Sequence, residues 1–328
     1  MWQFMLRRLS YALLAVFVIS LVSFAVIQLP PGDYVTDMIN RVRATGGKVD
    51  PEFEQRMREV YGFNQPMIVQ YAKWLTNILT RGEFGYSFIY KRDAGEMIME
   101  RLPTTAVMVF GAVLLTWVIA LPLGVMAAVY KRTAIDYSAI FIGFVGLAVP
   151  SFMLAIVVLF VVYRTFGRAT IGLFSPEYVA APWSVNRLLD LLKNMWLPAL
   201  ITAVTGIGAL TQTMRANLLD ELNKPYVNTA RAKGLPEWRL LWKYPVRHAL
   251  NPFVSTIGWL LPALVAGDVV ISIVLNLPTA GSMLYAALLQ QDQYVAAGFI
   301  LLLSSLTVIG TLISDLLLAL LDPRIRLS

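Results

Sequence analysis

The chain has 328 residues, of which 58% are hydrophobic and 14% are charged, and its mean hydropathy is +0.65. This composition excludes an ordinary soluble domain and predicts an all-α protein that crosses a membrane several times. The net charge of +7 would suit nucleic acid, but the basic residues are dispersed between apolar runs and form no single face, which argues against that partner. With no cysteine and one histidine, His248, the chain also lacks the residues of disulfides and of most zinc sites, so no metal site is expected.

Six stretches are long and apolar enough to cross a bilayer, whose hydrocarbon core takes about 20 helical residues. The first follows Arg7 and Arg8, yet its apolar run is too long for a signal peptide and no cleavage site follows it, so we interpret it as an uncleaved span. Residues 1–328 are therefore expected to form a single transmembrane domain. The six spans are placed at about 9–29, 103–129, 137–163, 196–217, 252–276 and 296–321.

Basic residues in the connections predict the orientation of the spans. One side of the membrane receives 13 basic and 5 acidic residues, a net charge of +8, and it includes the connection at 218–251. The other side receives 14 basic and 13 acidic residues, a net charge of +1. Since short cytoplasmic loops are enriched in Lys and Arg, we expect the first side to be cytoplasmic, with both termini on it.

The connection at 30–102 is too long for a simple link between two spans. Pro30-Pro31-Gly32-Asp33 ends the first helix, and Pro51 followed by Glu52 and Glu54 is typical of a helix start. Its ten acidic and ten basic residues balance, and aromatic residues supply packing material. We therefore expect an external cap of short helices, which either packs only on the spans or also contacts a soluble partner.

Small and polar residues inside the spans suggest close packing and a path through the bundle. Gly111, Gly124, Gly143 and Gly146 favour close approach of the second and third spans to their neighbours. Pro150 lies near the middle of the third span and predicts a kink. The fourth span has a flexible polar stripe that suits a pore or another helix better than lipid: Thr202, Thr205, Gly206, Gly208, Thr211, Gln212 and Thr213.

Two acidic residues fall in apolar surroundings, where a carboxylate is costly and marks a functional candidate. Asp315 lies near the cytoplasmic end of the sixth span, where a basic partner at the interface would suffice. Asp268 lies deeper in the fifth span, one turn before Ser272, and is the better candidate to line a path. A membrane aspartyl protease would also use two aspartates, but its Gly-x-Gly-Asp signature is absent because position 265 is valine.

The stretch 226–252 is charged and punctuated by prolines, and it separates the fourth and fifth spans. Gly234 permits a sharp turn and Pro236 stands where a second helix would begin, which predicts a helix–turn–helix on the membrane surface. Such an element either docks on a partner protein or lies in the lipid headgroups. An apolar stripe at helical spacing would provide the contact: Leu235, Trp238, Leu241 and Trp242.

Several motifs of self-contained chemistry are absent. The sequence has no phosphate-binding loop of the form Gly-x-x-x-x-Gly-Lys-Ser/Thr, no His-Glu-x-x-His zinc motif and no Gly-x-Ser-x-Gly nucleophile elbow. The chain is therefore not expected to be an enzyme, nor to bind ATP by itself.

Motifs along the whole chain resemble the B-type inner-membrane permease subunit of ABC importers for oligopeptides and dipeptides. The most specific is Tyr226-Val227-Asn228-Thr229-Ala230-Arg231-Ala232-Lys233-Gly234-Leu235, similar to that family's coupling loop. Asn228 and Thr229 replace the Glu-Ala of the wider superfamily, so the role of the glutamate is not carried over. The other matching motifs are Pro31–Asp33, Tyr61–Pro66, Gly82–Ser87, Arg101–Thr105, Val149–Phe152, Leu197–Ala199 and Asp322–Arg326.

The resemblance implies an assembly in a bacterial or archaeal cytoplasmic (inner) membrane. A second homologous permease would complete the pore, two cytoplasmic ABC ATPases would hold ATP and Mg²⁺, and an external binding protein would deliver the substrate. The ATPases would each receive one coupling helix, and their closure on ATP would drive alternating access. The residues assigned to ATPase coupling are Tyr226, Asn228, Thr229, Ala230, Arg231, Ala232, Lys233, Gly234, Leu235 and Pro236.

The cargo is less well specified than the architecture. Ser272 stands where many peptide permeases have a glutamate, Asp268 provides an acid one turn away, and Gln212 replaces a frequent arginine. With Thr205 these residues are assigned to the translocation path. Peptides are the preferred cargo, oligosaccharides and opines are alternatives on the same architecture, and a proton-coupled secondary transporter using Asp268 or Asp315 is the alternative of another class.

Overall fold

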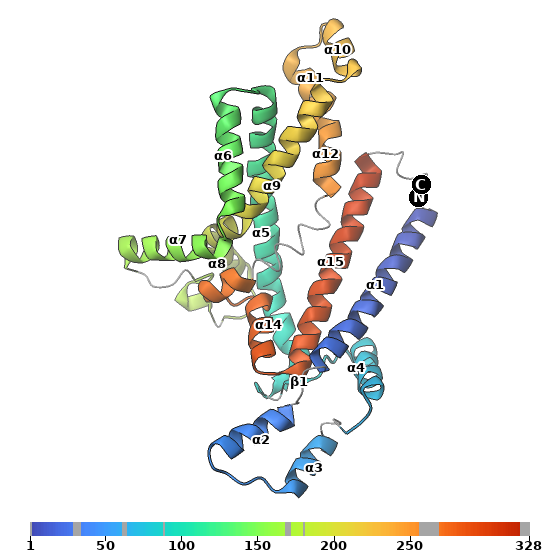
Figure 1. Cartoon of the computed structure of the whole chain (residues 1–328), viewed down its shortest axis with the longest axis vertical. Coiled ribbons are helices and arrows are strands. Elements are labelled where there is room, and N and C mark those ends of the chain that lie inside the picture. Colours follow the sequence, from blue (N-terminus) through green and yellow to red (C-terminus); the bar gives the residue numbers. More distant parts are fainter. Residues whose placement is uncertain are drawn as a thin grey trace. The chain divides into compact units, whose positions relative to one another are not determined.

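The computed structural model describes residues 2–28, 34–60, 64–87, 89–167, 172–179, 181–255 and 269–321 (Figure 1). It confirms the all-α class, since a single two-stranded hairpin and one short 3-10 turn interrupt the helices of this part of the chain. The helices are α1 (Trp2–Gln28), α2 (Tyr34–Ala44), α3 (Pro51–Val60), α4 (Met67–Arg81), α5 (Ala94–Val129), α6 (Ala134–Ala148), α7 (Ser151–Phe166), α8 (Val185–Asn194), α9 (Trp196–Leu222), α10 (Pro225–Ala232), α11 (Glu237–Lys243), α12 (Pro245–Ser255), α14 (Ala280–Leu289) and α15 (Gln293–Leu321); the hairpin strands are β1 (Tyr86–Ser87) and β2 (Arg92–Asp93).

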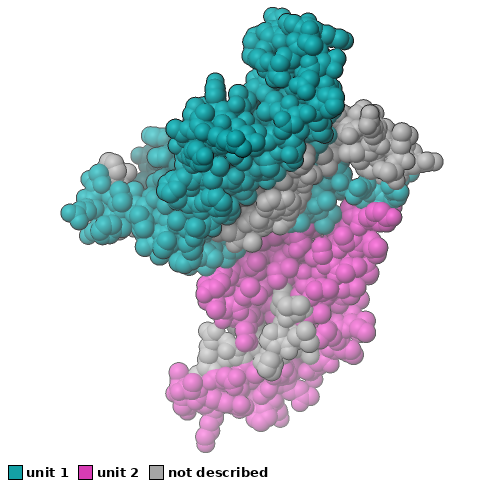
Figure 2. Space-filling view, turned by 45° about the horizontal axis from the view of Figure 1, so that its top comes forward, with its two compact units in different colours: residues 1–8, 106–277, 307–328 teal, residues 9–105, 278–306 magenta. Residues whose placement is uncertain are grey.

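The chain divides into two compact units, coloured separately in Figure 2. Unit 1 contains residues 1–8, 106–277 and 307–328, and unit 2 contains residues 9–105 and 278–306. Three helices, α1, α5 and α15, run from one unit into the other. Along α5 the division falls between Thr105 and Ala106.

Four helices of the described residues are long and apolar enough to cross a membrane: α1, α5, α9 and α15. The bent pair α6 and α7 would make a fifth if it is one span. The predicted span at 252–276 lies mostly outside the described residues, although 269–274 are helical. The count of six spans therefore stays a prediction.

The predicted kink at Pro150 appears as a break between two helices. Val149 (φ −87°, ψ 117°) and Pro150 (φ −58°, ψ 132°) are both extended, and α6 and α7 meet at 97°. A proline forces the preceding residue away from the helical region, so two successive residues leave the helix. The 15 residues of α6 rise about 22 Å, less than the roughly 30 Å of a hydrocarbon core, so α6 alone is too short to cross it.

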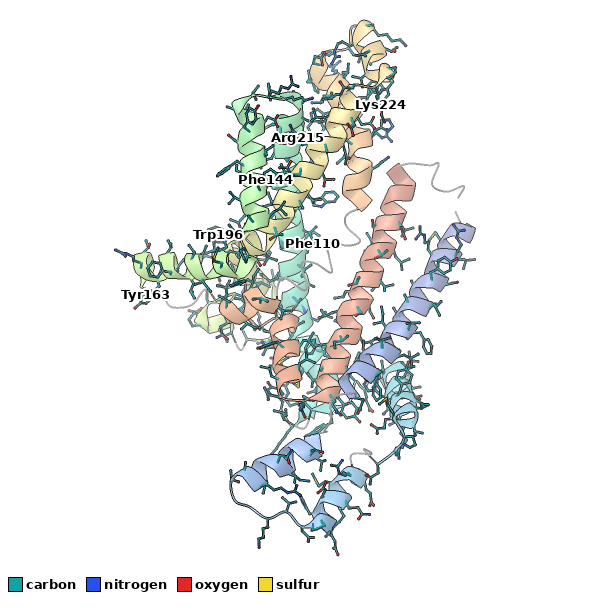
Figure 3. The ribbon with its side chains drawn as sticks, viewed as in Figure 1. Phe110, Phe144, Tyr163, Trp196, Arg215 and Lys224 are labelled. Atoms are coloured by element: carbon teal, nitrogen blue, oxygen red, sulfur yellow. The ribbon has the colours of Figure 1, made fainter. Side chains whose placement is uncertain are left out.

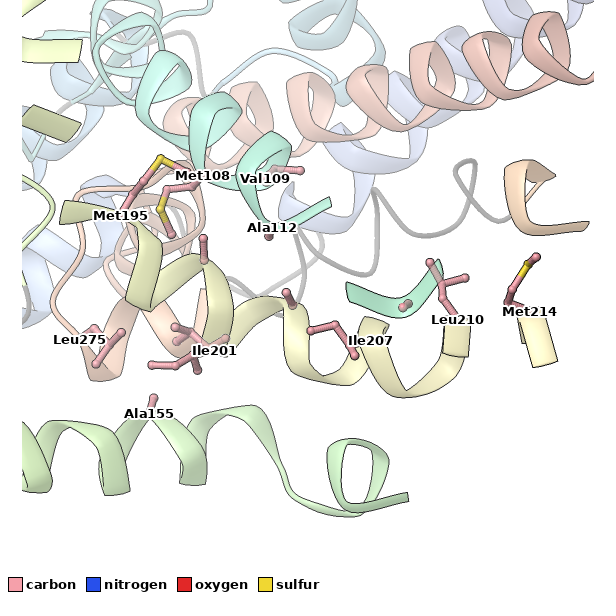
Figure 4. Packing of buried hydrophobic residues seen from close by; sticks show 14 of the residues in the cluster. Met108, Val109, Ala112, Ala155, Met195, Ile201, Ile207, Leu210, Met214 and Leu275 are labelled. Atoms are coloured by element: carbon pink, nitrogen blue, oxygen red, sulfur yellow. The ribbon is translucent and has the colours of Figure 1, made fainter. Parts of the chain in front are cut away.

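Unit 1 is built around α9, which packs against α6, α7, α8 and α12. In Figure 4, α9 with Ile201 runs between α5, which carries Met108 and Ala112, and α7, which carries Ala155, and these side chains belong to one buried cluster. The core is thus contributed by segments far apart in sequence.

Glycines let α9 approach α6 and α5 at backbone distance. A methyl group built on Gly208 would lie 2.5 Å from the carbonyl oxygen of Gly143, and one on Gly146 would lie 2.8 Å from the carbonyl oxygen of Val204. On α5, a methyl on Gly124 would meet the side chain of Met214 at 2.6 Å. These crossings have no room for a side chain, as predicted for small residues in packed spans.

Unit 2 joins α4 and the β-hairpin to the start of α15. Gly82 ends α4 in the left-handed conformation (φ 69°), and Gly85 (φ 110°) lies so close to the ring of Tyr294 that a methyl group would be 2.7 Å from it. The buried Ser87 hydroxyl donates a hydrogen bond to the carboxylate of Asp292, immediately before α15. The motif Gly82–Ser87 therefore connects the end of α4 to the start of α15 within unit 2.

Two aromatic residues of the 30–102 connection, Tyr71 and Trp74, pack as predicted. The ring centre of Phe24 of α1 lies 5.6 Å from that of Tyr71 and 5.5 Å from that of Trp74, both on α4. The indole N–H of Trp74 donates to the carbonyl oxygen of Phe84 at 2.8 Å. The described part of the connection shares its unit with residues 9–28 of α1, with α14 and with the start of α15, and its role as an external cap stays a prediction.

Substituting Gly208 by alanine is expected to lower the free energy of unfolding by about 1–3 kcal/mol, because the methyl group has no space against Gly143. Denaturant unfolding in detergent micelles, followed by circular dichroism, measures the change. Gly172→Ala is the matched control, since its nearest neighbour would lie at an ordinary 3.4 Å. Equal losses in the two variants would contradict the tight crossing.

Asp292 is expected to make the stability of unit 2 depend on pH. Burial raises the pKa of its carboxyl group, although hydrogen bonds from Ser87 and from the backbone N–H groups of Val295 and Ile89 oppose the shift. Stability should be complete below the usual aspartate pKa and fall as the pH rises through the raised value. In Asp292→Asn this loss should disappear.

Thermal midpoints of the purified chain between about pH 4 and pH 8 provide the measurement. Asp190→Asn is the control with the opposite sign, because hydrogen bonds from the hydroxyl and backbone N–H of Ser175 lower the pKa of Asp190. That variant should be most destabilised at neutral pH. A wild-type midpoint that does not fall between acid and neutral pH relative to Asp292→Asn would show the assignment to be wrong.

Candidate functional site

The coupling segment, residues 218–251, follows the C-terminal end of α9 and contains α10, α11 and the start of α12 (Figure 1). The turn between α5 and α6 lies at the same end of unit 1. There Arg215 of α9 binds Asp136 of α6 through two hydrogen bonds of 2.6 and 2.9 Å. Figure 3 labels Arg215 near this end of α9 and Lys224 where the segment leaves it.

Helix α10 presents one buried and one exposed face. Pro225 occupies its first turn, where the missing N–H costs nothing. Val227 and Ala230 are buried, whereas Asn228 and Thr229 are exposed. The helix is therefore fixed from below, and its outer face is available to another molecule.

The turn between α10 and α11 depends on Gly234. Its φ of +78° lies in the left-handed region, and a methyl group built on it would meet nothing within 4 Å. Pro236 follows in an extended conformation (φ −63°, ψ 139°) and precedes the first residue of α11. Glycine is thus required here by the backbone and not by packing.

An exposed ion pair holds the two arms of this turn together. The guanidinium of Arg231 donates to the carboxylate of Glu237 at 2.5 and 3.1 Å. These hydrogen bonds hold the pKa of Glu237 below its usual range. Both side chains are at the surface, so a partner protein would meet a charged but neutralised pair.

A small core lies under the turn. The fully buried residue of α11 is Leu240, which packs with Val227 and Ala230 of α10. In the predicted apolar stripe, Trp238 and Trp242 are 65% and 53% exposed, whereas Leu235 and Leu241 are half-buried. The role of the stripe as a contact surface stays a prediction.

Polar contacts fix the base of the segment to the end of α9. The phenol of Tyr226 donates a hydrogen bond to Glu221, which also accepts one from Lys224 at 2.6 Å. Burial, with the hydrogen bond to Glu221, raises the pKa of Tyr226 above its usual range, so the phenol stays a donor. The ring of Tyr226 also meets the edge of His248 at 5.6 Å.

The ten residues assigned to ATPase coupling form one continuous element. Ala230 is buried beneath it and Tyr226 and Leu235 are half-buried. The other seven residues are exposed: Asn228, Thr229, Arg231, Ala232, Lys233, Gly234 and Pro236.

Within the described residues no three His, Cys, Asp or Glu side chains gather to hold a metal ion. The coupling segment therefore suits protein docking, and the ten residues include no candidate catalytic group.

The structure describes three of the four residues assigned to the translocation path. Thr205 is exposed on α9, whereas the amide of Gln212 donates to the carbonyl oxygen of Ile140 on α6 at 3.4 Å. Ser272 is fully buried, and Asp268 lies outside the described residues. The path assignment stays a prediction, with Gln212 also serving the contact between α6 and α9.

Two ion pairs were not assigned from the sequence. Asp136, 2% exposed at its side chain, binds Arg215 and also accepts from the backbone N–H of Arg132 at 2.8 Å. Asp315 binds Arg8 at 2.9 Å, which supplies the basic partner near the interface that its position called for. A single acidic residue at the start of an apolar helix was the available signal for Asp136.

Comparison of the sequence with known proteins assigns the chain to a family. Residues 120–327 match the family described as binding-protein-dependent transport system inner membrane component, and residues 1–109 match the N-terminal region of such a membrane component. The chain is 32% identical to the oligopeptide transport system permease protein AppB of Bacillus subtilis strain 168, over 99% of this chain and 100% of that protein. It is 28% identical to the "Probable D,D-dipeptide transport system permease protein DdpB" of Escherichia coli strain K12, over 99% of this chain and 97% of that protein.

The resemblance found in the sequence motifs is thereby confirmed. Both matches extend over nearly the whole length, including the coupling segment and the motif Gly82–Ser87. The chain belongs to the inner membrane components of binding-protein-dependent transport systems, the permease subunits of ABC importers.

Proposed function

We propose that the chain forms half of the pore of an ATP-driven importer and that its coupling segment seats in a cytoplasmic ATPase. The observation behind this proposal is the exposed turn around Gly234, supported underneath by Val227, Ala230 and Leu240. A surface element that only lay in water would need no such core. A rigid support is what a movable docking element requires.

The contacts of α9 indicate how movement would reach the pore. The coupling segment is tied to α9 through Glu221, and α9 is tied to α6 through Arg215 and the glycine crossing. When two ATPases close on ATP, a displaced coupling segment would therefore carry α9 and α6 with it as one body. This is alternating access by rigid-body motion around a central path.

The partners follow from the same proposal. A second homologous permease completes the pore, two ABC ATPases hold ATP and Mg²⁺, and an external binding protein delivers the cargo. The chain itself binds no nucleotide, and the bilayer is that of a bacterial or archaeal inner membrane with both termini inside. Arg7 and Arg8 at one end and the basic coupling segment agree with that orientation.

Peptides are the proposed cargo. The names of two relatives refer to oligopeptides and to D,D-dipeptides, and the likeness to each extends over nearly the full chain. Oligosaccharides and opines remain the alternatives within this architecture. Mass spectrometry of the ligand that copurifies with the binding protein encoded beside this chain distinguishes them.

A proton-coupled secondary transporter, with Asp268 or Asp315 as the proton carrier, is the competing class. Asp315 is ion-paired with Arg8 at 2.9 Å, and Asp268 lies outside the described residues.

Uptake into vesicles separates the two classes. The chain reconstituted alone should transport nothing under a proton gradient, whereas the complete assembly should take up labelled peptide with ATP and without a gradient. Uptake by the single chain, abolished by a protonophore, would overturn the ATP-driven assignment.

Bulk at Gly234 should uncouple the ATPases from transport. Gly234→Trp is expected to abolish peptide-stimulated ATP hydrolysis and uptake, because the side chain projects into the space that a docked ATPase fills. Insertion into the membrane should be unchanged, and the free energy of unfolding should fall only by the cost of a non-glycine residue in the left-handed conformation, about 1–2 kcal/mol, because a Cβ at Gly234 would meet nothing within 4 Å.

Gly234→Asn is the matched control, because asparagine tolerates the left-handed conformation and adds little bulk. It should retain most of the activity. If both variants lose activity equally, the requirement at Gly234 is conformational only and the proposed contact with the ATPase is refuted.

A further inference from the structure

Helix α8 has its polar and apolar faces reversed relative to a helix that borders water. Val185, Leu188, Leu189 and Leu192 are all exposed, at 73%, 37%, 58% and 48%. Their spacing of three and four residues places them on one side of the helix. Only Leu191 points into the core of unit 1.

The opposite face of α8 is occupied by contacts with its own chain. The carboxylate of Asp190 accepts hydrogen bonds from the hydroxyl and the backbone N–H of Ser175, at 2.6 and 2.7 Å. The guanidinium of Arg187 lies 4.7 Å from the ring centre of Phe174 and 4.8 Å from that of Trp183, and it donates to backbone carbonyl oxygens of the preceding loop. Arg187 and Asp190 are thus turned toward the protein, whereas Asn186 and Lys193 on this side remain exposed.

Two tryptophans stand at the ends of the helix. Trp183 precedes α8 and is 40% exposed, and Trp196 at its junction with α9 is 59% exposed (Figure 3). Exposed tryptophans gather where a membrane meets water, because the ring is apolar and its N–H is polar. Since α9 is about 40 Å long, α8 and the coupling segment lie at opposite ends of one membrane-sized helix.

We propose that α8 lies in the boundary between headgroups and acyl chains of the bilayer leaflet opposite to the coupling segment. The occupant of its apolar face is lipid. Water is disfavoured because four neighbouring aliphatic side chains would be exposed to it while Arg187 and Asp190 are engaged by the protein. A protein partner is disfavoured because α7, which precedes α8, is apolar on all sides and needs the same lipid environment.

This placement gives α8 a role in the membrane. Ser175 and the loop that carries Trp183 hold Asp190 and Arg187 of α8. In this position α8 would fix how deep in the bilayer α7, which begins after Pro150, is placed. The proposal requires only that the chain is inserted in a membrane and is independent of the cargo and of ATP coupling.

The absence of cysteine makes the test direct. Leu189→Cys, labelled with a nitroxide in the full chain reconstituted into phosphatidylethanolamine–phosphatidylglycerol vesicles, is compared with Asn186→Cys on the other face. Oxygen, which partitions into lipid, should collide with the label at Leu189 several-fold more often, relative to a water-soluble nickel chelate, than with the label at Asn186. Val185→Cys provides a second position on the lipid face should the label at Leu189 disturb folding.

Two results would overturn the proposal. Frequent collisions with the nickel chelate at Leu189 and Val185 would place the face in water. Protection of both positions from both reagents would show that a protein covers it. Neither result would bear on uptake in the vesicle assay, so the test does not depend on the transport proposal.

Discussion

The close crossing of α9 and α6 is the contact on which unit 1 depends. Gly208 and Gly143 bring the two backbones together, and at one end of the crossing the buried Asp136 is satisfied by Arg215 and by the N–H of Arg132. In a membrane the lipid tails are as apolar as the side chains, so helix association depends on close packing and hydrogen bonds. A glycine crossing with an ion pair at its end provides both, and it makes the two helices move as one.

The coupling segment also combines a close-packed core with polar contacts. Leu240, Val227 and Ala230 form a small core, and Tyr226 closes its base on Glu221. Its outer surface is exposed and carries polar residues together with Trp238 and Trp242. Pro225 and Pro236 fix backbone φ angles on either side of the turn, and Gly234 permits the left-handed conformation that the turn needs.

The sequence predicted features that depend on one residue and its neighbours in the chain, but it did not predict contacts between residues far apart in the chain. The turn at Gly234 was predictable because backbone permissiveness belongs to the residue itself, and the break at Pro150 was predictable in place. Its 97° angle was not, because Val149 leaves the helix together with the proline. Membership of the apolar stripe was readable only in part, because Leu235 lies before Pro236 and so belongs to no continuous helix with Trp238. Asp136 and Arg215 are 79 residues apart, and the residues around each of them give no sign that the two form an ion pair.

The passage of α5 from one unit to the other has a mechanical consequence. Pro103 lies two residues before the division at Thr105 and has no N–H to donate to the preceding turn, so the helical rod is missing one backbone hydrogen bond there. The hydroxyl of Thr105 donates to the carbonyl oxygen of Arg101 and accepts from the N–H of Ala280, which pins the rod on the unit 2 side. Bending α5 at Pro103 breaks one backbone hydrogen bond fewer than bending it at a turn without proline, and this position lies next to the residue at which the two units divide.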